Sequence, residues 1–102
     1  MSYVESACRT FNAKEAIAQH LRVKVDATGV EDAGIADIDI GTAEVAALAA
    51  NEKIPVRLRN ATGTVEMVAS EAFAVGAALY SAAAGKVSDT AAATSYRVGT
   101  AI

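Results

Sequence analysis

The sequence contains no tryptophan and only one cysteine, one histidine and one proline. The lone thiol of Cys8 cannot form a disulfide within the chain and is typical of a protein made in a reducing compartment. The lone imidazole of His20 excludes a multi-histidine metal site within one chain. The chain also lacks an apolar run of the roughly 18 residues that span a bilayer and a basic-then-apolar signal at its start. We therefore expect a protein that is synthesised in the cytoplasm and does not associate with a membrane.

A surplus of basic charge is also lacking. The 9 basic and 12 acidic residues are mixed along the chain, and the net charge is −3. Without a basic block there is no electrostatic footprint for nucleic acid.

At 102 residues the chain has room for one small domain. Hydrophobic residues make up 53% of it, but about a quarter of all residues are alanine. The core is therefore thin, and it suits packing against neighbouring molecules better than holding the strained geometry of an enzyme.

Strict alternation of apolar and polar residues marks residues 21–26 and 54–59. Successive side chains of a strand point to opposite faces, so each segment is predicted to be a strand with an apolar and a charged face. The apolar faces comprise Leu21, Val23, Val25, Ile54, Val56 and Leu58, and the charged faces comprise Arg22, Lys24, Asp26, Arg57 and Arg59. Because Pro55 has no N–H to donate, its segment is predicted to be an edge strand, or its nitrogen to face outward.

The other elements are expected to be short, because turn residues recur at intervals of about ten residues, as in an all-β sandwich or barrel. We predict an extended N-terminal arm over residues 1–12 and a single β domain over residues 13–102. Further strands are expected at residues 30–33, 34–41, 64–69, 77–81, 86–90 and 96–102. Turns are expected at 27–29, where Gly29 can take a positive φ, and at the hairpin loop 60–63. One or two helical turns are expected within residues 12–20, begun by Asn12. For residues 44–51 a strand and a helix both remain open; we favour a single helical turn, with Asn51 in a left-handed conformation at its end.

Two residues are candidates for acid–base or nucleophilic chemistry. We expect His20 to end the short helix, where its charge would suit the local dipole. Cys8 would act as a nucleophile only beside a base such as His20, and no third orienting group is evident. We therefore predict that the chain is not an enzyme and has no catalytic residue.

The acidic residues Glu31, Asp32, Asp37 and Asp39 raise a calcium or glycosidase hypothesis. The ligand spacing of an EF-hand loop is absent, and no strongly apolar neighbour is expected to raise the pKa of Asp37 or Asp39. We expect a solvated acidic face, or one that meets basic residues of a partner. The sequence predicts no metal-binding and no cofactor-binding residue.

Several short motifs follow one another over most of the chain after about residue 12. They are Glu-Ala-Ile at 15–17, Leu-Arg-Val-Lys-Val at 21–25, Gly-Thr-Ala at 41–43, Lys-Ile-Pro-Val-Arg-Leu at 53–58, Ala-Phe-Ala-Val-Gly-Ala-Ala-Leu-Tyr at 72–80, Ala-Gly-Lys-Val at 84–87 and Tyr-Arg-Val-Gly-Thr-Ala at 96–101. In order and spacing the chain resembles the capsid cement, or head decoration, proteins of tailed bacteriophages, a family long catalogued without an assigned function. Its members continue past the last motif, so the resemblance implies that a final closing strand is missing here.

The resemblance implies a small all-β domain of barrel or tulip type, with about seven or eight short antiparallel strands. It implies a non-enzymatic virion protein, made in the bacterial host cytoplasm, that sits on the outer capsid surface as a homotrimer. The expected partner is the major capsid protein, whose neighbouring subunits it would bridge; neither a cofactor, nucleic acid nor a membrane is expected. Our candidate contact residues lie in the arm and on charged strand faces: Tyr3, Val4, Arg9, Phe11, Asp37, Asp39, Arg57 and Arg59.

Two other classes of function remain as alternatives. A carbohydrate-binding or host-adhesion module usually exposes aromatic platforms, and this chain has three tyrosines and no tryptophan. A small enzyme would have to use Cys8 or the acidic residues described above.

Overall fold

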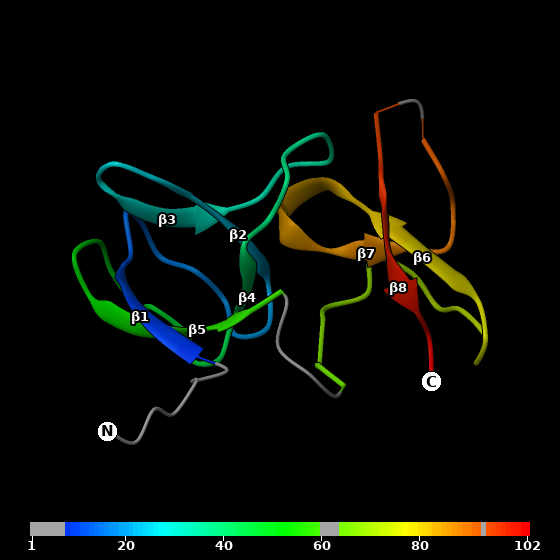
Figure 1. Cartoon of the computed structure of the whole chain (residues 1–102), viewed down its shortest axis with the longest axis horizontal. Helices are drawn as coiled ribbons and strands as arrows, with labels where there is room; N and C mark the ends of the chain where they lie inside the picture. Colours follow the sequence, from blue (N-terminus) through cyan, green and yellow to red (C-terminus); the bar gives the residue numbers. More distant parts are fainter. Residues whose placement is uncertain (1–7, 60–63, 93) are drawn as a thin grey trace, which may run out of the picture.

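The structure is a computed structural model that describes residues 8–59, 64–92 and 94–102, and these residues form an all-β fold (Figure 1). The described strands are β1 (Cys8–Asn12), β2 (Arg22–Asp26), β3 (Gly29–Asp32), β4 (Gly41–Ala43), β5 (Lys53–Leu58), β6 (Ala78–Ser81), β7 (Val87–Ser88) and β8 (Arg97–Thr100). One 3-10 turn, η1 (Ala83–Gly85), joins β6 to β7. The predicted class and the predicted number of short antiparallel strands are confirmed.

The first sheet contains five strands in the order β1-β5-β4-β2-β3, and all its neighbouring strands are antiparallel. The two alternating segments of the sequence form β2 and β5, as predicted. The sheet curls until its two outer strands meet at one bridge between Ala13 and Val30, where the Lys14 amide donates to the Val30 carbonyl at 2.8 Å. The expected barrel is nevertheless not closed, because β6, β7 and β8 form a separate sheet in the order β7-β6-β8.

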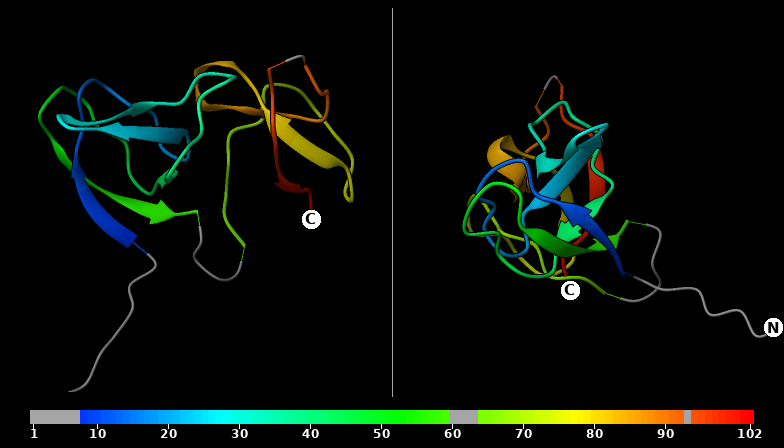
Figure 2. Two further views of the ribbon diagram at one scale, coloured as in Figure 1. Left: turned by 45° about the horizontal axis from the view of Figure 1, so that its top comes forward. Right: turned by 90° about the vertical axis from the view of Figure 1, so that its left-hand side faces the viewer.

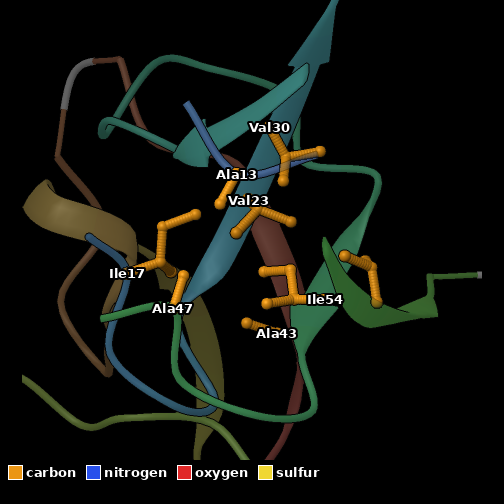
Figure 3. Packing of buried hydrophobic residues seen from close by; sticks show 8 residues of the cluster. Ala13, Ile17, Val23, Val30, Ala43, Ala47 and Ile54 are labelled. Atoms are coloured by element: carbon orange, nitrogen blue, oxygen red, sulfur yellow. The ribbon is translucent and has the colours of Figure 1, made fainter. Parts of the chain in front are cut away.

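The main hydrophobic core lies inside the curl of the first sheet (Figure 3). It combines a few branched side chains with alanines: Ala13, Ile17, Val23, Val30, Ala43, Ala47, Ile54 and Val56. The apolar face predicted for β5 is confirmed at Ile54 and Val56, but Val25 of β2 is 43% exposed. The reason is that β4 pairs only with the first two residues of β2, so the far end of β2 projects with β3 as a two-stranded ribbon. Gly29 closes that ribbon with a φ of 144°, which fits the positive φ expected of the glycine in this turn.

The second sheet lies beside the first, with β6 between β7 and β8 (Figures 1 and 2). Its strands come from the predicted segments 77–81, 86–90 and 96–102, although each strand is shorter than predicted. The pairing of β6 with β8 shifts register between Leu79 and Tyr80. On the other side, Ala69 bridges Val87 of β7.

The helical turns expected within residues 12–20 and 44–51 are not formed. Instead these two segments pair with each other: Ile17 and Ala47 exchange backbone hydrogen bonds of 2.9 Å in both directions. The Glu52 carboxylate accepts a hydrogen bond from the Ala49 amide at 3.0 Å. Tertiary hydrogen bonding therefore overrides the helix propensity of the alanines. Asn51 does adopt a left-handed conformation, with a φ of 71°, but it ends a turn and not a helix.

Two predicted strands are also wrong. Residues 34–40 form a turn, closed by the Asp37 carboxylate accepting from the Gly34 amide at 2.9 Å, because a short acid after glycine satisfies the backbone locally. Residues 64–68 form no strand, and the Val68 carbonyl accepts from the Val87 amide of β7 at 2.9 Å, so the predicted hairpin with residues 54–59 is not formed by the described residues. The loop expected at residues 60–63 lies outside the described residues.

The predicted arm and the predicted edge strand also differ from the structure. Residues 8–12 form β1, which pairs along its length with β5, while residues 1–7 lie outside the described part of the chain. β5 is not an edge strand, since β1 and β4 flank it. The Pro55 carbonyl accepts a hydrogen bond from the Glu44 amide, just beyond the end of β4. In a strand the nitrogen of a residue points to the same side as its carbonyl, so the nitrogen of Pro55 also points toward Glu44 and away from β1. The missing N–H therefore removes no hydrogen bond between β1 and β5.

Candidate functional site

A buried arginine joins the two sheets. Arg22, the first residue of β2, is 0% exposed, although the alternating pattern placed it on a charged face. Its guanidinium donates to the Ala82 carbonyl at 2.9 Å and to the Lys86 carbonyl at 3.1 Å, both at the ends of η1 in the second sheet. A buried guanidinium is stable only when its donors are satisfied, and these carbonyls satisfy them.

Tyr96 and Asp39 complete what we call the interface network, which consists of Arg22, Asp39 and Tyr96. Arg22 donates to the Tyr96 hydroxyl at 2.8 Å and lies 3.6 Å from an Asp39 oxygen. The Tyr96 hydroxyl in turn donates to the Asp39 carboxylate. Burial, followed by this hydrogen bond to Asp39, raises the pKa of Tyr96. Asp39 is 4% exposed, so the solvated acidic strand face that we expected for it is wrong.

Backbone contacts reinforce the same interface. The Gly85 amide donates to the Ala33 carbonyl at 2.7 Å, and the Ser81 hydroxyl donates to the Ile35 carbonyl at 2.6 Å. Gly85 has a φ of 75°, and a Cβ there would lie 2.8 Å from the Arg22 carbonyl oxygen. Hydrogen bonds therefore connect the second sheet to the first at several points.

Beside this interface the two sheets border an open cleft of about 490 Å³, within the size range of protein ligand sites. One wall comes from β4 and the end of β5, and the other from β6, β7, β8 and the segment before β6. The lining residues are Asp39, Gly41, Thr42, Arg57, Leu58, Arg59, Thr64, Val65, Met67, Phe73, Leu79, Val87, Val98, Gly99, Thr100, Ala101 and Ile102.

Thr42 of β4 is the unusual polar residue of the cleft. It is 2% exposed, and its hydroxyl oxygen has no hydrogen-bond partner among the described residues. Leaving a buried hydroxyl unpaired costs about 1–3 kcal/mol, so such a group is uncommon unless a ligand or water pairs with it.

Two arginines give the cleft a positive rim. Arg57 and Arg59 both line it at the end of β5. The Arg59 guanidinium lies 5.4 Å from the centre of the Tyr96 ring and 4.0 Å from an Asp39 oxygen, and its side chain is 43% exposed. Asp39, the acidic residue among the described lining residues, lies between Arg22 and Arg59, at 3.6 Å and 4.0 Å.

The acidic residues that suggested a metal site are separated by their lysine partners. Lys24 lies 3.0 Å from Asp37 and 3.5 Å from Glu31, and Lys14 lies 3.7 Å from Glu31. The Lys24 hydrogen bond, followed by that of the Gly34 amide, lowers the pKa of Asp37. Among the described residues no group of three or more potential metal ligands forms.

The candidate contact residues fall in different places. Tyr3 and Val4 lie outside the described residues. Arg9 and Phe11 lie on β1, where the Arg9 guanidinium is 5.7 Å from the Phe11 ring centre. Asp37 is in an exposed turn, and Arg57, Arg59 and Asp39 meet at the cleft. The contact roles of all eight residues stay predictions.

His20 and Cys8 occupy positions other than those expected. His20 has a φ of 68° in a turn, and its Nε2 lies 3.1 Å from a Glu66 carboxylate oxygen, so the expectation that it ends a helix is wrong. Cys8 is half-buried on β1, opposite Arg57. A nucleophilic role for Cys8 gains no support from this placement.

Sequence reasoning missed Arg22, Thr42 and Tyr96 as the residues that build the interface and the cleft. Thr42 belongs to the Gly-Thr-Ala motif at 41–43, and Tyr96 begins the Tyr-Arg-Val-Gly-Thr-Ala motif at 96–101. Membership of these motifs is the sequence feature that could have drawn attention to the two residues. The alternating pattern did not predict the burial of Arg22, because a charged residue at a polar position of a strand is ordinarily solvated.

The described part of the chain has no helix of the length and hydrophobicity that crossing a membrane requires. No family model, no curated protein and no solved structure matches this chain.

Proposed function

We propose that this chain is a structural virion protein: a cement or decoration protein that binds the outer surface of an assembled phage head and stabilises it by bridging major capsid subunits. The order of the motifs from residue 15 to residue 101 supports the proposal. The single observation that carries it is that each of the two sheets ends in an edge strand, β1 in the first and β8 in the second, toward opposite ends of the molecule (Figures 1 and 2).

Edge strands carry rows of backbone donors and acceptors that accept a further strand from another chain. A body with two such edges contacts two neighbouring subunits at once. The second contact then forms at high effective concentration, so two weak contacts give tight attachment. Bridging of this kind strengthens a shell at the seams between subunits without any bond being made or broken.

The β1 edge can be tested without disturbing the fold. Thr10 lies opposite Pro55, and because the polar backbone groups of Pro55 face Glu44, those of Thr10 point outward, away from β5. Thr10→Pro removes the outward N–H and leaves the β1–β5 hydrogen bonds in place, whereas Thr10→Ala keeps the N–H and serves as the matched control.

The experiment mixes the full-length protein with assembled heads that lack it and images the particles by cryo-electron microscopy. We expect density at defined lattice positions on the outer surface. Thr10→Pro should bind about 10²-fold more weakly, the scale on which avidity is lost with one of two contacts, while Thr10→Ala should bind like the natural chain. Heads that remain bare at saturating protein would refute the proposed function; equal binding of both variants would refute only the use of the β1 edge.

A further inference from the structure

Two exposed apolar turns lie at opposite ends of the molecule, one before β5 and one before β6. The sequence runs 45–50 and 72–79, which form these turns, contain no polar side chain. Each run presents one large residue to solvent: Leu48 is 83% exposed and Val75 is 82% exposed. The two turns mark the two ends of the longest axis, along which the molecule extends over 40 Å (Figure 1). Single apolar residues on a surface are ordinary, but contiguous ones are typical of an interaction site.

The first turn forms what we call the Leu48 patch. Ile17 and Ala47 pair with each other and are buried, so the residues on either side of them point outward. The patch consists of seven exposed residues from the two paired segments: Ala16, Ala18, Val45, Ala46, Leu48, Ala49 and Ala50. One leucine therefore stands among small side chains on a surface without charge.

The second turn forms what we call the Val75 patch, which consists of the exposed residues Ala74, Val75, Gly76 and Ile102. Its shape is set by Gly76, which has a φ of 90°. The Gly76 amide donates to the Ala101 carbonyl at 2.7 Å, and this hydrogen bond brings the turn beside the end of β8. Ile102, which follows Ala101, is 82% exposed like Val75.

Hydrogen bonds hold both turns in place before any partner binds. At the first turn, the Asn51 amide donates to the Ala13 carbonyl at 2.7 Å, in addition to the two bonds between Ile17 and Ala47. The second turn is held by the bond from Gly76 described above. A turn that is already ordered loses little conformational entropy on binding, so its apolar residues keep most of what their burial contributes.

We propose that the two patches are the anchors by which this chain holds two neighbouring copies of the capsid subunit, each patch covering an apolar depression on one copy. This inference rests on the proposed function. A stable pair of proteins buries about 800 Å², or roughly 20–30 residues, on each side, whereas the patches have seven and four residues. Neither patch is large enough for a stable dimer of this chain. An ordered lattice engages both patches at once, so two weak contacts give tight attachment.

The placement of the patches also favours a lattice over one compact partner. A partner of similar size can cover one end of the 40 Å axis but not both ends. The Leu48 patch belongs to the first sheet and the Val75 patch to the second, and the buried Arg22 joins the sheets through its 2.9 Å hydrogen bond to the Ala82 carbonyl. The spacing of the anchors is therefore fixed by the fold, as a repeating surface requires.

The test measures co-sedimentation of the full-length protein with assembled heads that lack it, over a concentration series. Leu48→Lys and Val75→Lys should each bind about 10- to 100-fold more weakly, the change expected when one large apolar side chain is no longer buried. The variant with both changes should show no saturable binding. Ile38→Lys is the matched control: Ile38 is 63% exposed in the turn before β4, between the two ends, and this variant should bind like the natural chain (Figure 1).

A second measurement tests the bridging itself. Unassembled capsid subunits offer one contact at a time, so the natural chain should bind them at least tenfold more weakly than it binds heads. Equal binding to subunits and heads would refute the use of two anchors. Circular dichroism checks the fold of each variant, and Leu48→Ser or Val75→Ser replaces a lysine variant that is unfolded.

The remaining outcomes separate this inference from the proposed function. Heads that stay bare with the natural chain would refute the proposed function itself. If the natural chain binds heads and either lysine variant binds as tightly, the inference is overturned while the proposed function stands. Without heads, sedimentation equilibrium should give the same mass for the natural chain and both variants. Self-association that either variant abolishes would overturn the inference, because it would assign that patch to a second copy of this chain.

Discussion

Replacing Arg22 with methionine should cost about 3–5 kcal/mol of folding stability, the range measured when one partner of a buried ion pair is removed. Methionine keeps most of the aliphatic volume but none of the donors. The change removes the guanidinium donor of the Ala82 carbonyl and one of the two donors of the Lys86 carbonyl. It also removes the nearer of the two arginines beside the Asp39 carboxylate, whose side chain is 3% exposed. A domain of this size has about 5–15 kcal/mol of stability in total, so the loss would be a large part of it.

Urea denaturation followed by far-UV and near-UV circular dichroism measures the effect. The near-UV signal reports the surroundings of the tyrosines, including Tyr96 at the interface. We expect a lower midpoint for Arg22→Met, and separate transitions for the two signals if the second sheet detaches first. The double variant Arg22→Met, Asp39→Leu should recover part of the stability lost in Arg22→Met, since it also removes the buried Asp39 carboxylate.

Lys24→Met is the matched control, because Lys24 lies two residues further along β2 and its ion pairs are partly exposed, whereas Arg22 is fully buried. It should change stability far less than Arg22→Met. A loss below about 1 kcal/mol for Arg22→Met, or a loss equal to that of the control, would refute the conclusion that the interface depends on the buried guanidinium.

Four further predictions concern the core, a glycine and two titrating groups. Ile54→Ala should cost about 2–5 kcal/mol in urea denaturation, because Ile54 is 2% exposed within the alanine-rich core; a smaller loss would mean that the site collapses around the alanine. Gly85→Ala should lower the melting temperature, since it combines a φ of 75° with a clash against the Arg22 carbonyl, and an unchanged value would contradict that contact. The pKa of Tyr96 is raised by burial and by Asp39, so its contribution to stability is full below about pH 10, the pKa of an unfolded tyrosine, and declines as the pH rises toward its folded value; Tyr96→Phe should show less alkaline destabilisation. The Lys14 and Thr28 hydrogen bonds hold the pKa of Asp26 well below its usual range, so Asp26→Asn should be less stable than the natural chain at pH 7, and the difference should shrink as the pH falls below about 4.

The parts of the fold that were predicted correctly share a local cause. β2 and β5 alternate apolar and polar residues, and a strand's period of two is a property of the chain itself. The turn at residues 27–29 was also predicted correctly, because a glycine between two expected strands indicates a reversal of the chain. Asn51 was correctly expected in a left-handed conformation, although the helix it was expected to end does not exist.

The errors arose where a distant segment supplied the hydrogen bonds. Residues 44–51 have high helix propensity, but Ala47 pairs with Ile17, thirty positions earlier in the chain. Residues 34–41 alternate like a strand, yet the side chain of Asp37 satisfies the Gly34 amide and makes a turn. Local propensity differs by only a few tenths of a kcal/mol per residue, so a small number of tertiary hydrogen bonds reverses it.

Composition and alternation by themselves determined that this chain is a small all-β protein with a thin, alanine-rich core, because both depend only on which residues stand next to each other. The tertiary structure alone decided that Arg22 is buried and that Asp39 and Tyr96, 57 residues apart in the sequence, meet it. It also decided that a cleft opens between the two sheets. Each of these depends on how one sheet is placed against the other, and only the folded chain brings these distant segments together.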